Sequence, residues 1–431
     1  MARSEPTFMR CIILMLSLAT TSQAAPPFEG EPSNTAIQAT LDQDNAVHLP
    51  KRDQPYVLDG PIILKSGQKL TADAGAVIQL KPGTNTCMVR NEHIVGFADK
   101  PVPEDTKPDT DIHIEGGIWT TFGEGNTRGH SSKQAHVHGT HGVILLQNVR
   151  RVTVRNITVR RSKAFAVHLA NARDFTVDGV TLDEHGRDGV HVNGPASDGV
   201  IRNVSGVSHD DTVGLNAWEW KNYAPSFGAI QHIVLEDIRG APDGIPSANS
   251  IRLLPGVKRF SDGTTLDCPI HDITIRRITD IRDFKLYDQP NLELGRDKDF
   301  SIGVGTLKNL RFEQLVFKRP GSIQVHANTD GLAVSDVKLD FSPRDKFSLI
   351  ELGPKSATYK HKPDDPATWI EIFSPDLDCT VRNASVTDVR FRDAKTDLPT
   401  NQIVRVIEQK PNPNYPKTTP RGGTGKAIWI R

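Results

Sequence analysis

The chain has 431 residues, with 52 basic and 52 acidic side chains, so its formal net charge is zero. A neutral chain is not expected to hold nucleic acid or an anionic membrane mainly through its electrostatic field. Only 6% of the residues are aromatic, whereas 34 are Gly and 29 are Pro. This composition argues against a helical bundle and favours many short strands joined by turns.

Residues 1–25 have the three parts of a secretory signal. Arg3 and Arg10 give a basic start, Cys11–Ala19 is apolar, and Ser22-Gln23-Ala24 supplies small residues at a cleavage site. A membrane anchor or a buried first helix is the alternative, but the apolar stretch is short for a span, which needs roughly 18 or more apolar residues. We therefore expect a mature protein that is secreted or periplasmic, with no membrane partner.

One short pattern repeats between about residues 140 and 345. Asn148–Val159 and Asn171–Leu182 both read as a strand, a bend and a second strand, and they begin 23 residues apart. Third strands follow in several copies, as in Gly189–Val192. Three short strands and three bends in this interval are typical of one rung of a parallel β-helix. A leucine-rich horseshoe lacks support because its Leu spacing is absent, and a β-sandwich would not repeat at a near-fixed interval.

The repeat predicts a single-domain, all-β solenoid. We expect a helix over Asn34–Leu41 to cap its first rung, the β-helix domain to cover 26–410, and 411–431 to form a Pro/Gly-rich tail. Cys87, Cys268 and Cys379 remain after cleavage and show no metal-binding spacing. One disulfide is compatible with them, but the sequence does not indicate its pairing.

Acidic residues gather at rung edges in two places. Asp188 precedes a predicted strand, and the pair Asp210 and Asp211 begins 22 residues later, which is one rung. Residues one rung apart lie about 4.8 Å from each other, so these carboxylates should adjoin. Their repulsion should keep one proton bound in mild acid, which is what general acid–base cleavage of a glycosidic bond requires. Turn-capping acids, or ligands of a structural cation, are the alternative.

The middle of the chain resembles the polygalacturonase-like glycoside hydrolases (family 28) of the pectin-lyase-like superfamily. Arg187–His191 is similar to the Asn-Thr-Asp-Gly-Ile/Phe-Asp motif of that family, and Asp210-Asp211 is similar to its Asp-Asp pair. Ala164–Val177 and Ile112–Trp119 resemble two further strands, and the likeness covers roughly residues 30–345. It implies a right-handed coil.

Two motifs of that family are missing. The stretch Ala248–Leu254 stands where the family has Gly-His-Gly, and Asp283-Phe284-Lys285 stands where it has Arg-Ile-Lys. The Arg that grips a uronate carboxylate is therefore absent, although Arg252 could replace it from the neighbouring rung. These departures put galacturonan itself in doubt, so a uronic and a neutral glycan both remain open.

The resemblance implies roles for the three acids in an inverting hydrolase. Asp210 would protonate the leaving oxygen, while Asp188 and Asp211 would hold and deprotonate the attacking water, without a metal or other cofactor. We expect the substrate to be a polysaccharide or oligosaccharide. The alternatives are a polysaccharide lyase on the same fold, which would use Lys or Arg with calcium, and a β-helix that binds glycans without cleaving them.

Eight further residues are candidates for binding the substrate. Aromatic rings stack on sugars, and charged or imidazole groups bond their hydroxyls, although each of these side chains has an ordinary structural alternative. The candidates are His168, His191, His209, Trp218, Glu219, Trp220, Arg252 and Lys285. The sequence does not indicate the oligomeric state.

Overall fold

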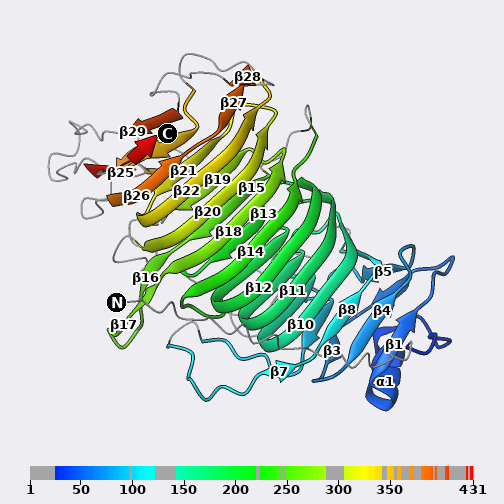
Figure 1. The fold of residues 1–431 in the computed structure, drawn as a ribbon. Coiled ribbons are helices and arrows are strands. Elements are labelled where there is room, and N and C mark those ends of the chain that lie inside the picture. Colours follow the sequence, from blue (N-terminus) through cyan, green and yellow to red (C-terminus); the bar gives the residue numbers. More distant parts are fainter. Residues whose placement is uncertain are drawn as a thin grey trace, which may run out of the picture.

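The computed structural model describes residues 25–97, 100–121, 142–219, 224–242, 245, 249–287, 305–341 and 347–353, followed by 357–360, 369–372, 380–391, 394–395, 403–406, 424–425 and 428–430. These residues form a right-handed parallel β-helix with one helix at its N-terminal end (Figure 1). The predicted all-β solenoid is confirmed. Within the described part of the chain, no helix is long and apolar enough to cross a membrane.

The N-terminal elements are α1 (Asn34–Asp44), β1 (Ala46–Leu49), β2 (Tyr56–Leu58), β3 (Ile62–Leu64), β4 (Lys69–Ala72), β5 (Val77–Leu80), β6 (Val89–Asn91), β7 (Asp109–Thr110), β8 (His113–Glu115) and β9 (Ile118–Thr120). The central elements are β10 (Ile144–Arg160), β11 (Val167–His185), β12 (Val190–Ser208), β13 (Asp211–Asn216), β14 (Ile230–Arg239), β15 (Ser250–Leu254), β16 (Gly256–Arg259), β17 (Thr265–Cys268), β18 (Ile270–Thr279) and β19 (Asp283–Tyr287). The C-terminal elements are β20 (Thr306–Phe317), β21 (Ser322–His326), β22 (Asn328–Leu339), β23 (Ile350–Leu352), β24 (Ala357–Lys360), β25 (Trp369–Ile372), β26 (Thr380–Val386), β27 (Val389–Phe391), β28 (Ala394–Lys395), β29 (Val404–Val406), β30 (Thr424–Gly425) and β31 (Ile428–Ile430).

The rungs stack in parallel register with a step of 23 residues where the repeat is cleanest. Val167 pairs with Val190 across β11 and β12, and Val190 pairs with Val213 across β12 and β13. Each strand alternates core residues with residues that face outward, so residues at equal rung positions form straight columns. Figure 1 shows these stacked strands running from α1 at one end to β26 and β29 at the other.

Two columns of bends turn each long strand around the core. All of their members have positive φ, which suits Asn, Asp and Gly because their side chains are short or absent. The first column contains Arg151, Asp174, Asp198, His232, Asp272, Asn309, Gly331 and Asn383, and the second contains Asn156, Gly179, Asn203, Asp237, Arg277, Gln314, Asp336 and Asp388. The Asn and Asp residues of the sequence repeat are therefore bend residues.

Helix α1 closes the N-terminal end of the core, as predicted. Ser33 caps it by accepting a hydrogen bond from the Ala36 N–H at 3.3 Å, and Asn45 ends it in the left-handed conformation. Ile37 and Leu41 are fully buried against the first rung. The apolar face of this helix thus covers core residues that a bare first rung would expose to water.

Only part of the expected tail, 411–431, lies within the described residues. There, β30 and β31 both pair with β26, so the described part of this segment extends the main sheet. Cys87 and Cys268 are buried free thiols, and burial raises their pKa values to about 11 and about 12. Cys379 lies outside the described residues.

Candidate active site

One outward-facing column on the sheet containing β13, β15 and β19 carries four of the predicted site residues. Its members alternate along their strands with core residues such as Val190 and Val192. The column contains, in consecutive rungs, His168, His191, Gly214, Arg252 and Lys285. The sequence distances between these residues vary widely, yet each pair of neighbours lies one strand apart.

The three predicted acids converge at the edge of this column. Asp188, Asp210 and Asp211 each present a carboxylate oxygen, and these oxygens lie within 4.8 Å of one another. Our expectation of a 22-residue rung was wrong here, because Val190 pairs with Val213, a step of 23. Two residues before this pair, the same register places Asp188 opposite Asp211. Asp210 lies at the bend that precedes β13.

Asp211 is fully buried and surrounded by donors. Its Oδ1 accepts hydrogen bonds from Ser250 Oγ at 2.7 Å and from Lys285 Nζ at 3.0 Å. The Arg252 Nε lies 2.9 Å from Oδ2. Two cations and a hydroxyl therefore hold this carboxylate in one orientation, and two of the residues predicted to bind substrate contact it instead.

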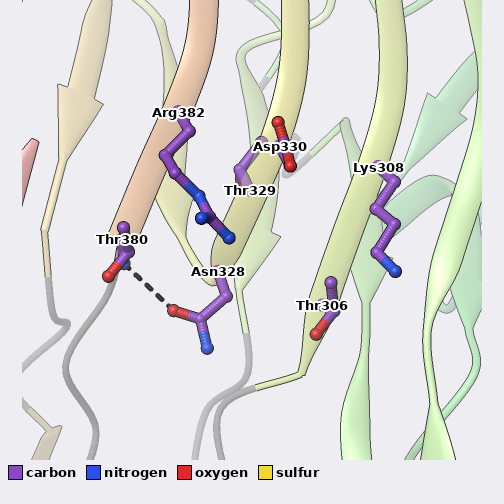
Figure 2. Close-up of a pocket in the computed structure, with 7 residues that line it drawn as sticks. All are labelled: Thr306, Lys308, Asn328, Thr329, Asp330, Thr380 and Arg382. Atoms are coloured by element: carbon purple, nitrogen blue, oxygen red, sulfur yellow. Dashed lines mark hydrogen bonds between the residues drawn. The ribbon is translucent and has the colours of Figure 1, made fainter. Parts of the chain in front are cut away.

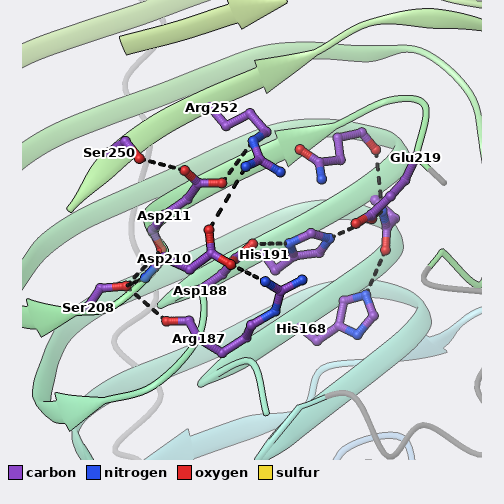
Figure 3. A network of polar contacts seen from close by, with 12 residues as sticks. His168, Arg187, Asp188, His191, Ser208, Asp210, Asp211, Glu219, Ser250 and Arg252 are labelled. Carbon is purple, nitrogen blue, oxygen red and sulfur yellow. Dashed lines mark hydrogen bonds and ion pairs between the residues drawn. The ribbon is translucent and has the colours of Figure 1, made fainter. Parts of the chain in front are cut away.

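Asp210 is the most accessible of the three acids, with a side chain 22% exposed. It lies between two arginines, pairing with Arg187 on one side and approaching the Arg252 guanidinium at 3.9 Å on the other (Figure 3). Burial, with repulsion from Asp188 and Asp211, nevertheless raises its pKa to about 6, against the opposing pull of the arginines. Asp210 thus retains a proton in mild acid.

Asp188 belongs to a buried chain of three ionisable groups. Its Oδ2 lies 2.7 Å from His191 Nδ1, and His191 Nε2 lies 2.9 Å from Glu219 Oε2. Burial lowers the pKa of His191, but Glu219 and Asp188 outweigh this and raise it to about 9. Burial likewise opposes ionisation of Asp188, yet the bond to His191, with Arg187 and Arg252 nearby, holds its pKa well below the usual range.

Phe165 and Asn193 hold the two histidines of the column. The rings of Phe165 and His191 stack with centroids 3.9 Å apart and planes inclined by 2°. His168 Nε2 lies 2.7 Å from Asn193 Oδ1, and the Asn193 amide donates to Glu219 Oε2 at 2.9 Å. His168 is 1% exposed and His191 is fully buried, so both orient other groups of the site and neither offers a surface for sugar stacking.

Gly214 leaves one position of the column without a side chain, and we call this position the notch. A Cβ built on Gly214 would lie 3.4 Å from Asp188 Oδ2 and from His191 Nδ1, and 3.6 Å from Asn216 Oδ1. Asp188 Oδ1 and both polar atoms of the Asn216 side chain are buried and form no hydrogen bond with described residues. The notch is therefore bordered by polar atoms that can bond a small hydroxylic group.

The predictions for the segment after the acids were partly wrong. Trp218 is fully buried and packs on the backbone of Gly256 instead of offering a platform for a sugar ring. Glu219 is 2% exposed and binds His191 and Asn193, so it is neither a substitute acid nor an acceptor for sugar hydroxyls. His209 is exposed at the bend beside Asp210. Trp220 lies outside the described residues.

Arg187 and Ser250 are site residues to which the sequence analysis gave no role. Arg187 precedes Asp188, and its guanidinium lies 5.4 Å above the Phe165 ring while it pairs with Asp210. Ser250 is paired with Asp211 across β13 and β15. The adjacency of Arg187 to the motif was a signal for the first, but only the strand register could have found the second.

The three carboxylates have the donor chemistry of a calcium site but not its charge balance. Calcium is held by oxygen ligands whose negative charge it neutralises. Here Arg187, Arg252 and Lys285 already pair with Asp210 and Asp211. A calcium ion bound to the three carboxylates would therefore lie close to positively charged side chains that already pair with two of them. The repulsion between these charges makes the site a poor fit for calcium.

Comparisons with known proteins support the fold alone. No model of a known protein family matches the sequence, and no curated protein sequence matches it. The surface protein and adhesin PfbA of Streptococcus pneumoniae is similar in structure, with 11% identity, coverage of 86% of this chain and 92% of that chain, and a TM-score of 0.50. A family 28 exopolygalacturonase of Yersinia enterocolitica has 12% identity, coverage of 85% and 73%, and a TM-score of 0.44. The catalytic domain of a family 87 α-1,3-glucanase has 12% identity, coverage of 94% and 67%, and a TM-score of 0.42.

Proposed function

We propose that this chain is a glycoside hydrolase that cleaves a polysaccharide or oligosaccharide. One observation carries the proposal: a partly exposed acid with a pKa raised to about 6, Asp210, adjoins an ionised buried acid, Asp188. Neighbouring carboxyl groups whose environments push their pKa values apart are suited to act as proton donor and proton acceptor. Asp210 is the donor because it retains a proton and is the more exposed of the two.

The notch over Gly214 is the proposed position of the attacking water. Asp188 Oδ2 and Asn216 Oδ1 border it. Oδ2 is bonded to His191, and Oδ1 of the same carboxylate receives no hydrogen bond from described residues. The water oxygen forms a bond to the anomeric carbon while the bond from that carbon to the leaving oxygen breaks. Asp210 gives its proton to the leaving oxygen, and the water proton passes to Asp188 or Asp211.

The spacing of the acids makes stereochemistry a decisive test. Their oxygens lie within 4.8 Å, whereas the two carboxyl groups are typically about 5–5.5 Å apart in retaining enzymes and about 6.5–9.5 Å apart in inverting ones. The spacing alone therefore favours retention. The notch favours inversion because it offers a water site beside Asp188, so we propose inversion. Proton NMR of the first products should show the anomer opposite to the substrate linkage, and retention would make Asp188 a nucleophile.

A hollow lies beyond the acids on the same sheet. It has a volume of about 310 Å³ and is bordered by Asp283 of β19, Ser322 of β21, and Phe347 and Glu351 near β23. Asp283 is in register with Ser250, and Ser322 is in register with Asp283, so this hollow begins two rungs from Asp211. An aromatic ring with nearby carboxylates can bind a further sugar residue, which favours a substrate longer than a disaccharide.

The deciding experiment is digestion of a glycan panel, read both by reducing ends and by ultraviolet absorbance. Release of reducing ends without an absorbing product is expected, and an absorbing unsaturated product would indicate the lyase. Asp210→Asn should lower turnover about a hundredfold or more. Asp183→Asn is the matched control, because Asp183 pairs with Arg160 on the outer face of β11 and should leave turnover unchanged. Activity should persist in chelator.

A second variant tests the water site. Gly214→Ala adds one methyl group at ordinary van der Waals distances from its neighbours, so the fold should accept it. The methyl group nevertheless occupies the notch. We expect kcat to fall with KM little changed and with an unaltered unfolding midpoint. Full activity in Gly214→Ala would show that the attacking water lies elsewhere.

A further inference from the structure

A second hollow lies around the corner from the active-site sheet. It has a volume of about 410 Å³ and is formed by the first residues of β20, β22 and β26. Asn328, which begins β22, follows the last residue of β21 after one intervening residue, so the hollow begins where the chain leaves the active-site sheet. Nothing in the proposed reaction uses it.

Two cations face this hollow from alternate rungs. Lys308 and Arg382 are each in register with Asp330, one on either side of it, and are therefore about 10 Å apart along the coil. Figure 2 shows both side chains running toward the Asn328 end of the hollow. The carboxylate between them is bonded elsewhere, because Asp330 Oδ1 accepts a hydrogen bond from Asn383 Nδ2 at 2.7 Å.

Two other arginines of the coil, Arg150 and Arg276, do pair with an acid in the neighbouring rung. Arg150 pairs with Asp174 at 2.8 Å, and Arg276 pairs with Glu236 at 2.7 Å, in each case across neighbouring rungs. Lys308 and Arg382 both have Asp330 in the neighbouring rung, yet neither forms an ion pair with it or with any other residue in the described ranges. Among the described residues that line the hollow, two are cationic and one, Asp330, is acidic, so the lining has a net charge of plus one (2 − 1).

Neutral hydrogen-bonding groups complete the hollow. Thr306 and Thr380 contribute hydroxyl groups on the two sides of Asn328 (Figure 2). The Asn328 Oδ1 accepts a hydrogen bond from the Thr380 N–H at 3.0 Å, which fixes the orientation of the amide. Hydroxyl and amide groups between two cations are suited to a ligand that combines negative charge with many hydroxyls.

We propose that this hollow is an accessory binding site for an acidic glycan, one that carries carboxylate or sulfate groups. Arg and Lys are the side chains that recognise such groups, Arg through its planar fork and Lys as a point charge. Two cations about 10 Å apart suit charges repeated along an extended chain better than a single small anion. The site binds glycan without cleaving it and does not depend on the catalytic assignment.

Calorimetric titration of the full chain tests this proposal, with Asp210→Asn present throughout to prevent turnover. The probes are tetragalacturonate, a neutral tetrasaccharide and inorganic sulfate. The double variant Lys308→Ala/Arg382→Ala should bind tetragalacturonate at least about tenfold more weakly, with a smaller dependence on salt. The control Arg150→Ala/Arg161→Ala removes the same charge from paired arginines elsewhere on the coil and should bind normally.

Three outcomes would overturn the proposal. The first is equal affinity for tetragalacturonate in the double variant and its parent. The second is a neutral tetrasaccharide that depends on Lys308 and Arg382 to the same extent. The third is sulfate binding as tight as that of the tetrasaccharide, because the hollow would then hold a single anion. Failure of the hydrolase assignment would leave these binding results unchanged.

Discussion

Removing the charge of Arg187 should shift the pH profile of the reaction to higher pH. A variant that was only partly unfolded would lose activity without such a shift. The pKa of Asp210, about 6, is a balance in which burial and the neighbouring acids raise it and Arg187 lowers it. An adjacent cation typically lowers the pKa of a carboxyl group by about 1–3 units. Arg187→Met keeps an aliphatic side chain but removes that charge, so the pKa of Asp210 should rise by about one unit or more.

The assay is the pH profile of kcat/KM, which reports the ionisations of the free enzyme. In the parent protein the alkaline limb should fall near pH 6, as Asp210 loses its proton. In Arg187→Met that limb should lie about one unit higher, equivalent to about 1.4 kcal/mol. Lys285→Met is the control, because Lys285 pairs with Asp211 and should move the limb less. An alkaline limb that stays in place or falls in Arg187→Met would refute Asp210 as the proton donor.

Three other outcomes are expected. Asp210→Asn should raise the free energy of unfolding at pH 7 by up to about 3 kcal/mol and leave it unchanged near pH 3. The reason is that the raised pKa of Asp210 makes its ionisation unfavourable in the folded state. Urea unfolding that shows the same gain at both pH values would contradict this. The raised pKa of His191 stabilises the fold below pH 6.5, and this stabilisation is lost as the pH rises through about 9. Glu219→Gln should flatten that decline of the melting temperature, and an unaltered slope would exclude the Glu219–His191 pair as its cause. Exported protein should begin near Ala25 by mass spectrometry, and an intact Met1 would contradict the secretory signal.

The repeat made the fold predictable from the sequence. Asn148 and Asn171 lie 23 residues apart, and both have the positive φ that only a few residue types adopt easily. The period of the coil can therefore be recognised in the amino-acid sequence. The nearness of Asp188 to the acid pair followed from that period. The exact register did not follow, because nothing in the local sequence distinguishes a 22-residue rung from a 23-residue rung. A 22-residue rung would align Asp188 with Asp210, whereas the observed 23-residue rung aligns it with Asp211.

The orientation of the side chains after the acids could not be predicted. Trp218 and Glu219 follow β13 where strand alternation ends, so the period of two no longer tells which side chain faces the core. The structure buries both, and Glu219 becomes the partner of His191. A buried Glu is rare unless paired, and that pairing is a property of the packed rungs.

The column from His191 through Gly214 and Arg252 to Lys285 has a consequence for how such a site can change over evolution. Arg252 follows Gly214 by 38 residues and Lys285 follows Arg252 by 33, yet each step along the coil is one strand. Segments inserted at the corners lengthen the chain without moving the column, since strand stacking alone sets its spacing. Each rung can therefore gain a loop or exchange one outward side chain independently, so substrate preference can change while the acids remain in place.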